Sequence, residues 1–235
     1  MKIIKREFFC LCFLQIIFIT QLFGNENKSV LVNKINPTSE KFTPLFNGKD
    51  LSGWKTNGNW VVKKDGSLMI DPLPDQKGWN RFNDYLISEK TYANFILELE
   101  YKYPPQGNSG IFFRIGNPKN PVGTGTEIQI LDCFGQKDET MTHHDHGGII
   151  MFRRPLLNVS KKPGEWNHFI ISCEGHHVRV AINGVEVQNV YLDSPPDKDL
   201  PPYNLADRPM RGYIGLQDHG VPHRVVFRNI KILKI

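Results

Sequence analysis

The chain has 235 residues, a formal net charge of +5 at pH 7 and a hydrophobic content of 40%. This length and apolar content are sufficient for one sizeable β domain or two small ones with a buried core. The charge is mild, part of it lies in the first six residues, and no basic stripe follows, which argues against a nucleic-acid-binding protein.

The N-terminus has the pattern of an export signal. A cluster of basic residues within the first six positions precedes an apolar run over residues 8–24. The length of this run is typical of a signal peptide and short for a membrane span. We therefore expect residues 1–24 to be a signal peptide and the protein to be periplasmic or extracellular. Retention of this segment as a membrane anchor is the alternative.

Residues 25–41 are polar without a periodic pattern, which is typical of a linker. From residue 42 to residue 235 the chain alternates short apolar runs with turn signals, and no long linker interrupts it. We therefore expect a single domain over residues 42–235.

The first half of this region contains several predicted strands. Residues 59–71 form a predicted hairpin around Asp65-Gly66, a pair that type I′ turns favour. Over residues 85–104 we expect a strand, a break near Ala93-Asn94 and a longer strand. Two further strands are expected over residues 109–116 and 127–132.

The second half continues the same pattern. Apolar residues alternate over 164–190, where Asn183-Gly184 predicts another type I′ hairpin. Two final strands are expected over 211–220 and 223–233. Ten to twelve short strands without a capped amphipathic helix favour an all-β sandwich or barrel. The loop over 193–209, rich in proline and aspartate, is either a lid or rim of a site or a plain surface loop.

The strand over residues 127–132 carries unexpected polar residues. Glu127, Gln129 and Leu131 share one face, whereas Asp132 falls on the opposite face. Two carboxylates across a sugar bond are the usual acid–base pair of glycoside chemistry, and a one-residue bulge would turn Asp132 toward Glu127. The alternative is that Asp132 caps the following turn and Glu127 pairs with Arg114.

The strand before it begins and ends with polar residues. Asn108 and Ser109 lie at its predicted entrance, and Arg114 ends its apolar run. The planar guanidinium of Arg114 suits a carboxylate or several sugar oxygens. An ion pair with a nearby acid is the alternative role.

Histidines and tryptophans supply further candidates. His143, Asp145 and His146 are weak candidates for a divalent metal site, although a histidine such as His146 that reaches a sugar groove is favoured over metal binding. Gln217 and His219 point the same way from their strand, and a neutral histidine is a natural proton shuttle. A structural histidine is the alternative.

Two side-chain questions stay open at this level. Trp79, in a polar loop, is the best of the four tryptophans for stacking on a sugar, although most tryptophans of a sandwich belong to its core. Cys133 and Cys173 could form a disulfide in an oxidising compartment, and two buried free thiols are the alternative.

The motifs together resemble a known family. In order, the chain contains FTPLFNGKDLSGW, GNSGIFFR, EIQILD, PGEWN, INGVEV, GYIGLQDHG and VVFRNIKI. Over residues 42–235 this resembles the 3-keto-disaccharide hydrolase-like domain family. The resemblance implies a concanavalin A-like jelly-roll sandwich of two antiparallel sheets with a concave face that binds a carbohydrate.

Within that superfamily, the laminarinase-like glucanases carry a strand motif Glu-x-Asp-x-x-Glu. The matching positions here are Glu127, Gln129 and Asp132, so an ordinary double-displacement mechanism is not expected. A ketone at C3 of the sugar offers another route, because it acidifies the C2 proton. A base can remove that proton, and the enolate can expel the group at C1.

The resemblance therefore implies an exported enzyme that cleaves 3-keto-glycosides, by hydrolysis or elimination. The expected base is Glu127 or His146, Arg114 or a bound cation holds the enolate, and His219 or Asp132 protonates the leaving oxygen. No cofactor is certain, although a divalent metal is an option. A non-catalytic lectin-like module is the alternative function, and a structural or adhesion domain is a third. The expected substrate-binding residues are Asn108, Ser109, Gln129, Gln217 and Trp79.

Overall fold

The computed structural model describes residues 41–201 and 204–235. The expected signal peptide and all but the last residue of the expected linker lie outside these residues. Within the described part of the chain, no helix is long and apolar enough to cross a membrane.

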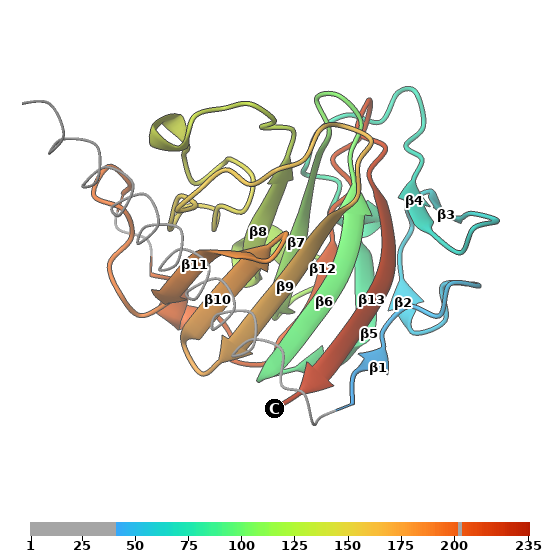
Figure 1. Ribbon diagram of the computed structural model, residues 1–235. Coiled ribbons are helices and arrows are strands. Elements are labelled where there is room, and N and C mark those ends of the chain that lie inside the picture. The colour runs from blue at the N-terminus through green and yellow to red at the C-terminus, as the bar shows by residue number, and fades with distance from the viewer. Residues whose placement is uncertain (1–40, 202–203) are drawn as a thin grey trace, which may run out of the picture.

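Two antiparallel sheets form the described part of the chain, as the sequence pattern predicts (Figure 1). The larger sheet contains β1 (Thr43–Pro44), β3 (Trp60–Val62), β4 (Leu68–Ile70), β6 (Phe95–Lys102), β9 (Asn167–Glu174), β10 (His177–Ile182), β11 (Val185–Tyr191) and β13 (Val226–Lys234). The smaller sheet contains β2 (Trp54–Lys55), β5 (Leu86–Tyr92), β7 (Asn108–Ile115), β8 (Thr126–Leu131) and β12 (Gly212–Leu216).

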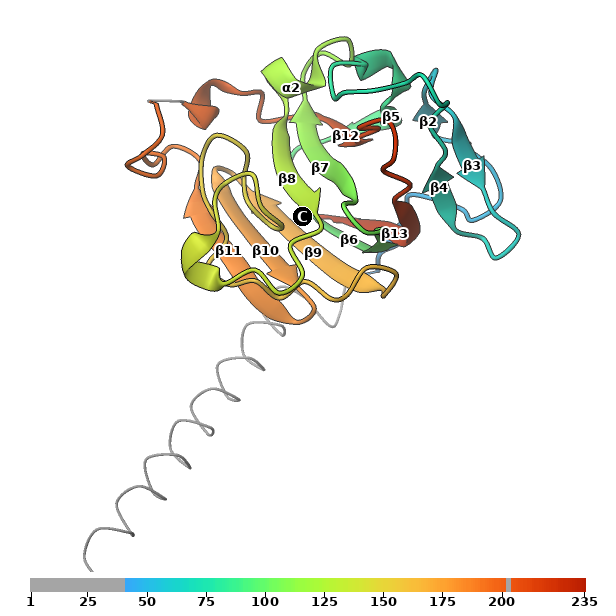
Figure 2. The ribbon, with the colours of Figure 1, turned by 90° about the horizontal axis from the view of Figure 1, so that it is seen from above.

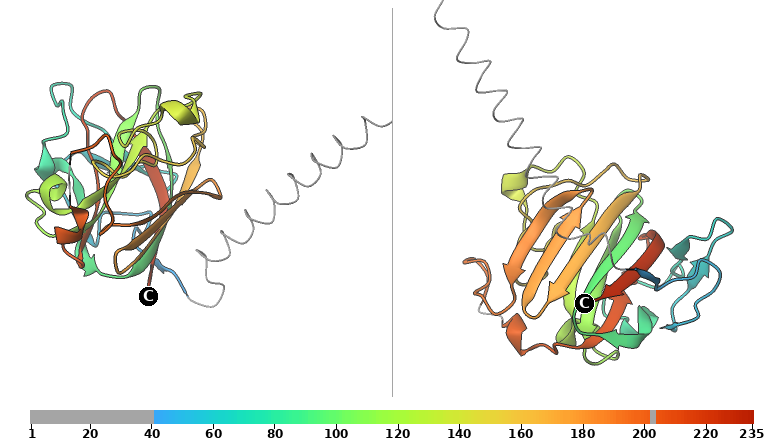
Figure 3. Two further views of the ribbon diagram at one scale, coloured as in Figure 1. Left: turned by 90° about the vertical axis from the view of Figure 1, so that its left-hand side faces the viewer. Right: turned by 60° about the horizontal axis from the view of Figure 1, so that its bottom comes forward.

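The strand order is β11-β10-β9-β6-β13-β4-β3 in the larger sheet, where β1 also pairs with β13, and β2-β5-β12-β7-β8 in the smaller one. The sheets lie in two layers (Figure 2), and the right-hand view of Figure 3 shows the larger sheet from the orange strands through green β6 to red β13. Helical segments of the described chain are short: η1 (Phe82–Asp84), α2 (Pro121–Thr124), η2 (Asp138–Thr140) and η3 (Leu205–Asp207).

The core lies between the two sheets and follows from strict alternation along the strands. In β6, Leu97 and Leu99 are buried in it, whereas Glu98 and Glu100 point to the outer face of the larger sheet. In β8, alternate residues of the smaller sheet reach the same core. Alternation therefore leaves an outer face on the smaller sheet where polar side chains can gather.

The predicted turns differ in their outcome. Asn183 and Gly184 have φ angles of 53° and 79°, which confirms the type I′ turn between β10 and β11. At the other predicted site only Gly66 has a positive φ, and its N–H donates to Lys63 O at 2.9 Å. The hairpin of β3 and β4 is present, but its turn is not type I′. The break near Ala93-Asn94 separates β5 from β6, as expected.

The two described cysteines are free thiols. Cys133 and Cys173 are both buried and not bonded to each other. Burial raises the pKa of each thiol to about 12. The structure therefore favours the alternative of two buried thiols over a disulfide.

Candidate functional site

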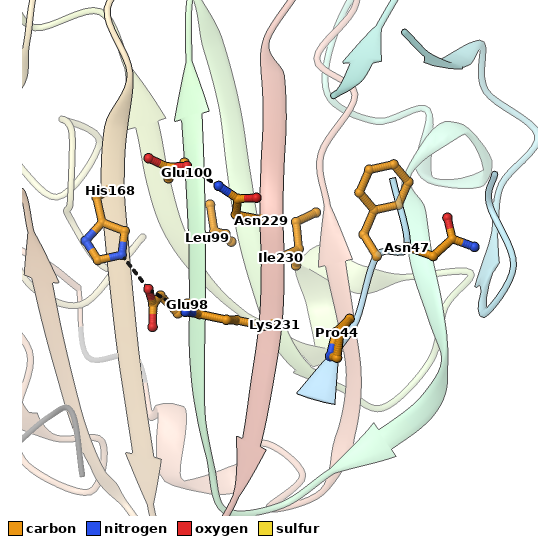
Figure 4. Close-up of a pocket in the computed structure, with 10 residues that line it drawn as sticks. Pro44, Asn47, Glu98, Leu99, Glu100, His168, Asn229, Ile230 and Lys231 are labelled. Carbon is orange, nitrogen blue, oxygen red and sulfur yellow. Dashed lines mark hydrogen bonds and ion pairs between the residues drawn. The ribbon is translucent and has the colours of Figure 1, made fainter. Parts of the chain in front are cut away.

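Two hollows of the described surface differ in how their polar groups are paired. The larger, of about 790 Å³, lies over the outer face of the larger sheet (Figure 4). There Glu98 bonds to His168 at 3.0 Å and to Lys231 at 3.1 Å, and Asn229 donates to Glu100. Because its charged groups neutralise one another, this hollow offers few free groups to a ligand.

The second hollow, of about 470 Å³, lies on the outer face of the smaller sheet, and we call it the β8 pocket. Its floor comes from β7, β8 and the residues that follow β12. Its rim comes from three loops, before η1, at α2 and after η2. The lining residues are Trp79, Asn108, Val122, Glu127, Gln129, Leu131, His144, Ile150, Met151, Gln217 and His219.

Alternation along β8 places its polar residues at the pocket, as predicted. Glu127, Gln129 and Leu131 line the pocket, whereas Ile128 and Ile130 lie in the core. The pairing of β7 with β8 runs without interruption to Leu131, where β8 ends. No bulge therefore turns the next residue toward the pocket, and that expectation was wrong.

Asp132 has the turn-capping role that was the alternative. One carboxylate oxygen accepts from Phe134 N at 3.3 Å and the other from Gln106 N at 2.9 Å. Asp132 does not line the pocket. Its placement does not fit the expected role of proton donor to a leaving oxygen.

Glu127 lies across a glycine of the neighbouring strand. It faces Phe112 in the register of β7 and β8, and Gly110 pairs with Gln129 in the next row. A Cβ at Gly110 would come within 2.1 Å of the Glu127 Oε1 atom. The missing side chain of Gly110 therefore makes room for the Glu127 carboxyl group.

The carboxyl group of Glu127 is buried without a partner among the described residues. The residue is 9% exposed, and it takes part in no side-chain hydrogen bond or ion pair. Burial raises its pKa to about 8. A carboxyl group in such surroundings titrates near neutral pH and suits proton transfer.

Three amides of the pocket have unused hydrogen-bonding capacity. The side-chain oxygens of Asn108, Gln129 and Gln217 are buried and have no partner within the described structure. The Gln217 Nε2 atom donates to the Tyr85 hydroxyl at 2.9 Å, and that hydroxyl donates to Trp79 O at 2.8 Å. An unpaired buried polar group is costly, so a ligand rich in hydroxyls would be favoured here.

His219 lies beside these amides and is neutral. Burial and the neighbouring His223 lower its pKa to about 4. The His219 Nδ1 atom has no partner within the described structure. The preceding residue, Asp218, is fully buried and accepts from Arg81 at 2.8 Å and from Gly220 N at 2.8 Å. This loop therefore holds a neutral imidazole against the pocket.

Trp79 is placed as the sequence pattern suggested, on the rim and with 49% of its surface exposed. An exposed indole beside hydroxyl-binding amides can stack on a sugar ring.

The long loop over 193–209 contributes no lining residue among its described positions. The plain surface loop, not the lid, fits this placement.

Arg114 lies away from the pocket, which corrects two expectations. In the pairing of β7 with β12, Tyr213 faces Ile115 and Gly215 faces Phe112, so β7 has an extra residue here. Arg114 has a φ of 53° and donates to Ala93 O and Gly175 O at 2.7 Å. The bulge thus directs the Arg114 guanidinium toward two loops of the sandwich. The guanidinium does not pair with Glu127, and it lies too far from the pocket to hold an enolate.

The histidine-rich segment also differs from expectation. His146 is 1% exposed and contacts the Tyr101 hydroxyl at 2.6 Å, and burial lowers its pKa to about 3. Asp145 accepts from Thr142 N at 2.6 Å, and His143 Nδ1 accepts from Met151 N at 2.9 Å. His146 is therefore a structural histidine and not a base in the groove.

The described residues contain no group of three or more His, Cys, Asp or Glu side chains placed to hold a metal ion. Of the weak metal candidates, His143 and Asp145 form hydrogen bonds within their own loop, whereas His146 contacts Tyr101 on β6. Ser109 is also structural, because it is fully buried and its hydroxyl donates to Gln217 O at 2.8 Å. It positions the pocket rather than lining it.

The sequence pattern did not identify the apolar residues that line the β8 pocket, nor the pocket histidine His144. Residues 147–150 continue the smaller sheet, since Gln129 N donates to Gly148 O at 2.9 Å and Ile150 N donates to Glu127 O at 3.2 Å. This brings His144, Ile150 and Met151 to the rim. No local signal marks them, because the segment has no strand periodicity.

Comparisons with known proteins agree with this architecture. A family model described as the 3-keto-alpha-glucoside-1,2-lyase-like domain matches residues 41–233. A protein of Bacteroides thetaiotaomicron named 3-keto-disaccharide hydrolase is 24% identical over 230 residues, and the match covers 83% of this chain and 78% of that protein. These likenesses support a carbohydrate-active function.

Solved structures extend the comparison. A crystal structure from Parabacteroides distasonis, provisionally named a glycosyl hydrolase, has a TM-score of 0.70 and 30% identity, and covers 83% of this chain and 100% of that one. A Bacillus subtilis protein with a galectin-like fold has a TM-score of 0.54 and 12% identity, and covers 83% of this chain and 94% of that one. The latter likeness shows the jelly-roll sandwich fold alone.

Proposed function

Because the chain belongs to the 3-keto-alpha-glucoside-1,2-lyase-like domain family, we propose that the β8 pocket cleaves the glycosidic bond of 3-keto-glycosides, and that it does so outside the cytoplasm. The single observation that carries this proposal is Glu127, a buried carboxyl group without a partner and with a raised pKa. It lies among amides that are free to bind hydroxyls.

The proposed reaction begins with proton transfer from C2 of the sugar to the Glu127 carboxylate. The C3 ketone takes up the electron pair as an enolate, and a hydrogen-bond donor of the pocket stabilises that oxygen. The free amides of Asn108 and Gln129 are the candidates for this donor. The enolate then reforms its carbonyl group, a C1–C2 double bond forms, and the bond from C1 to the leaving oxygen breaks.

The leaving oxygen needs a proton, and His219 is the candidate that remains after Asp132 is placed outside the pocket. In an α-glucoside the C2 hydrogen and the C1 oxygen lie on opposite faces of the ring. The base and the proton donor must therefore flank the sugar, which a side chain on β8 and one in the loop after β12 can do. Water that adds to the C1–C2 double bond would complete a net hydrolysis.

The test is incubation of the protein with a 3-keto-α-glucoside in D₂O. Deuterium incorporation at C2 is read by NMR and product formation by mass spectrometry. We expect Glu127→Gln to lose both, by a factor of at least about 100, since general-base catalysis contributes about 10²–10⁴. Exposed Glu139→Gln is the matched control and should retain full activity.

Binding without turnover or C2 exchange in the wild-type protein would contradict the proposal and favour a lectin-like module. Loss of activity in both glutamate variants would also contradict it, because the effect would then not come from the pocket. Addition of a chelator in a parallel reaction measures any dependence on a divalent metal.

A further inference from the structure

We infer that the group expelled from C1 is apolar, so that the substrates are 3-keto-glycosides of an aliphatic or aromatic ring and not of a second sugar. This inference rests on the proposed function of the β8 pocket and defines its substrate class more closely. It comes from the unequal distribution of polar and apolar side chains around Glu127.

The amides lie on one side of Glu127. In the strand register, the row after Glu127 contains Gln129 opposite Gly110, and Gln217 N donates to Gly110 O at 2.9 Å. The following row places Leu131 opposite Asn108. Ring hydroxyls of the keto-sugar thus find their partners in these two rows.

Apolar side chains lie in the row of Glu127 itself, away from the two amide rows. Ile150 N donates to Glu127 O, which places Ile150 beside Glu127. Val122 packs against a buried cluster that includes Phe112, the residue opposite Glu127. Ile150, Val122 and Met151 all line the pocket; the first two have no side-chain group that can bond to a hydroxyl, and the Met151 sulfur is only a weak acceptor.

The remaining rim residue on that side is a histidine. The His143 and His144 rings lie with centroids 4.0 Å apart, and His143 accepts from Met151 N, so His144 is near Met151. An aromatic ring can stack on an imidazole. The residues that line the pocket include no lysine or arginine, so nothing there favours an anionic leaving group.

The chemistry at C2 orients the sugar between these two sides. The base must face C2, and C1 is its immediate neighbour in the ring. When C4 and C6 lie toward the amides, the substituent at C1 lies toward Val122, Ile150 and Met151. A second sugar there would bury hydroxyls without partners, whereas a hydrocarbon ring would gain contact.

The experiment compares cyclohexyl 3-keto-α-glucoside with a 3-keto-disaccharide whose leaving group is glucose. Cyclohexanol is the poorer leaving group, so a preference for it cannot come from leaving-group chemistry. We expect kcat/KM to be at least about 10-fold higher for the cyclohexyl compound, as expected for a ring buried in an apolar pocket. Titration of Glu127→Gln with the same compounds measures binding apart from turnover.

Val122→Thr keeps the shape of the side chain and replaces one methyl group with a hydroxyl, and it should lower the preference for the cyclohexyl compound about threefold or more. Val190→Thr, on β11 and packed against the central core, is the matched control and should leave the preference unchanged. Equal or better use of the disaccharide, or a preference that Val122→Thr does not alter, would overturn the inference. If neither compound reacts but Glu127→Gln binds the cyclohexyl compound more tightly than the disaccharide, the proposed reaction is contradicted and the apolar subsite is supported. If Glu127→Gln binds the two compounds equally well, the apolar subsite is contradicted.

Discussion

At the scale of single residues, the β8 pocket depends on one carboxyl group that has no cation beside it. Ion pairs elsewhere on the protein, such as Glu98 with Lys231, keep their carboxylates charged. Glu127 instead lies over Gly110 and beside apolar side chains, so that its neutral form is favoured. A carboxyl group of this kind is a stronger base than an ordinary carboxylate once it has lost its proton.

The pH dependence of catalysis follows from this. If Glu127 removes the C2 proton, kcat/KM should rise with pH and level off above its pKa of about 8. Because His219 has a pKa of about 4, it stays neutral over this range and adds no second limb between pH 6 and 9. A pH–rate profile of the wild-type enzyme measures the midpoint, and a rate that falls through pH 8 would assign Glu127 as an acid.

The pH dependence of stability tests the same pKa without a substrate. An unfolded glutamate has a pKa of about 4.3. Since the folded-state pKa is about 8, the folded protein holds this proton more tightly, and its contribution to stability is full below pH 4 and lost as pH rises through 8. The difference in Tm between Glu127→Gln and the wild type should therefore shift in favour of the variant from pH 5 to pH 9, by about 2–4 °C or more. An equal difference in Tm at both pH values would contradict the raised pKa.

At the scale of elements, the bulge in β7 decides what Arg114 does. Its guanidinium donates to Ala93 O in the β5–β6 turn and to Gly175 O in the β9–β10 turn. It thereby connects turns that are far apart in the sequence. Regular alternation would have placed Arg114 on the face of Phe112, and this is why the sequence pattern misplaced it.

We expect Arg114→Lys to destabilise the protein by roughly 3 kcal/mol, because a single ammonium group cannot serve both turns and leaves buried carbonyls unpaired. Thermal unfolding measures the loss, with exposed Arg154→Lys as the control. At a temperature where both variants are folded, KM for a 3-keto-glycoside should match the wild type. A rise in KM without a loss of Tm would instead indicate that Arg114 takes part in substrate binding at the β8 pocket.

At the scale of the whole molecule, the sandwich holds together without a bond between its described cysteines. Cys133 and Cys173 are buried in different parts of the structure, and burial raises their pKa to about 12. Thiolates are the reactive form, so both residues should resist alkylation in the folded protein. Peptide mapping after alkylation in denaturant without reductant should find both thiols labelled, and Tm should not change with reductant. A linked Cys133–Cys173 peptide would contradict this.

The sequence alone determined the class of fold and much of the floor of the site. Period-two alternation is a local property, and it was sufficient to place Glu127 and Gln129 on the outer face of β8. Gln217 and His219 were expected to lie together on a strand over 211–220; they do line the pocket together, but β12 ends before them at Leu216. The type I′ turn at Asn183-Gly184 was equally local. The order of the motifs was sufficient to identify the family.

Only the tertiary structure decided which polar residues meet. The bulge that turns Arg114 away, the burial of His146 against Tyr101 and the addition of residues 147–150 beside β8 all depend on contacts between distant segments. The raised pKa of Glu127 has the same origin, because it comes from apolar neighbours such as Ile150 that reach it from another loop. Residue type and spacing describe one strand, whereas burial is set by everything that packs around it.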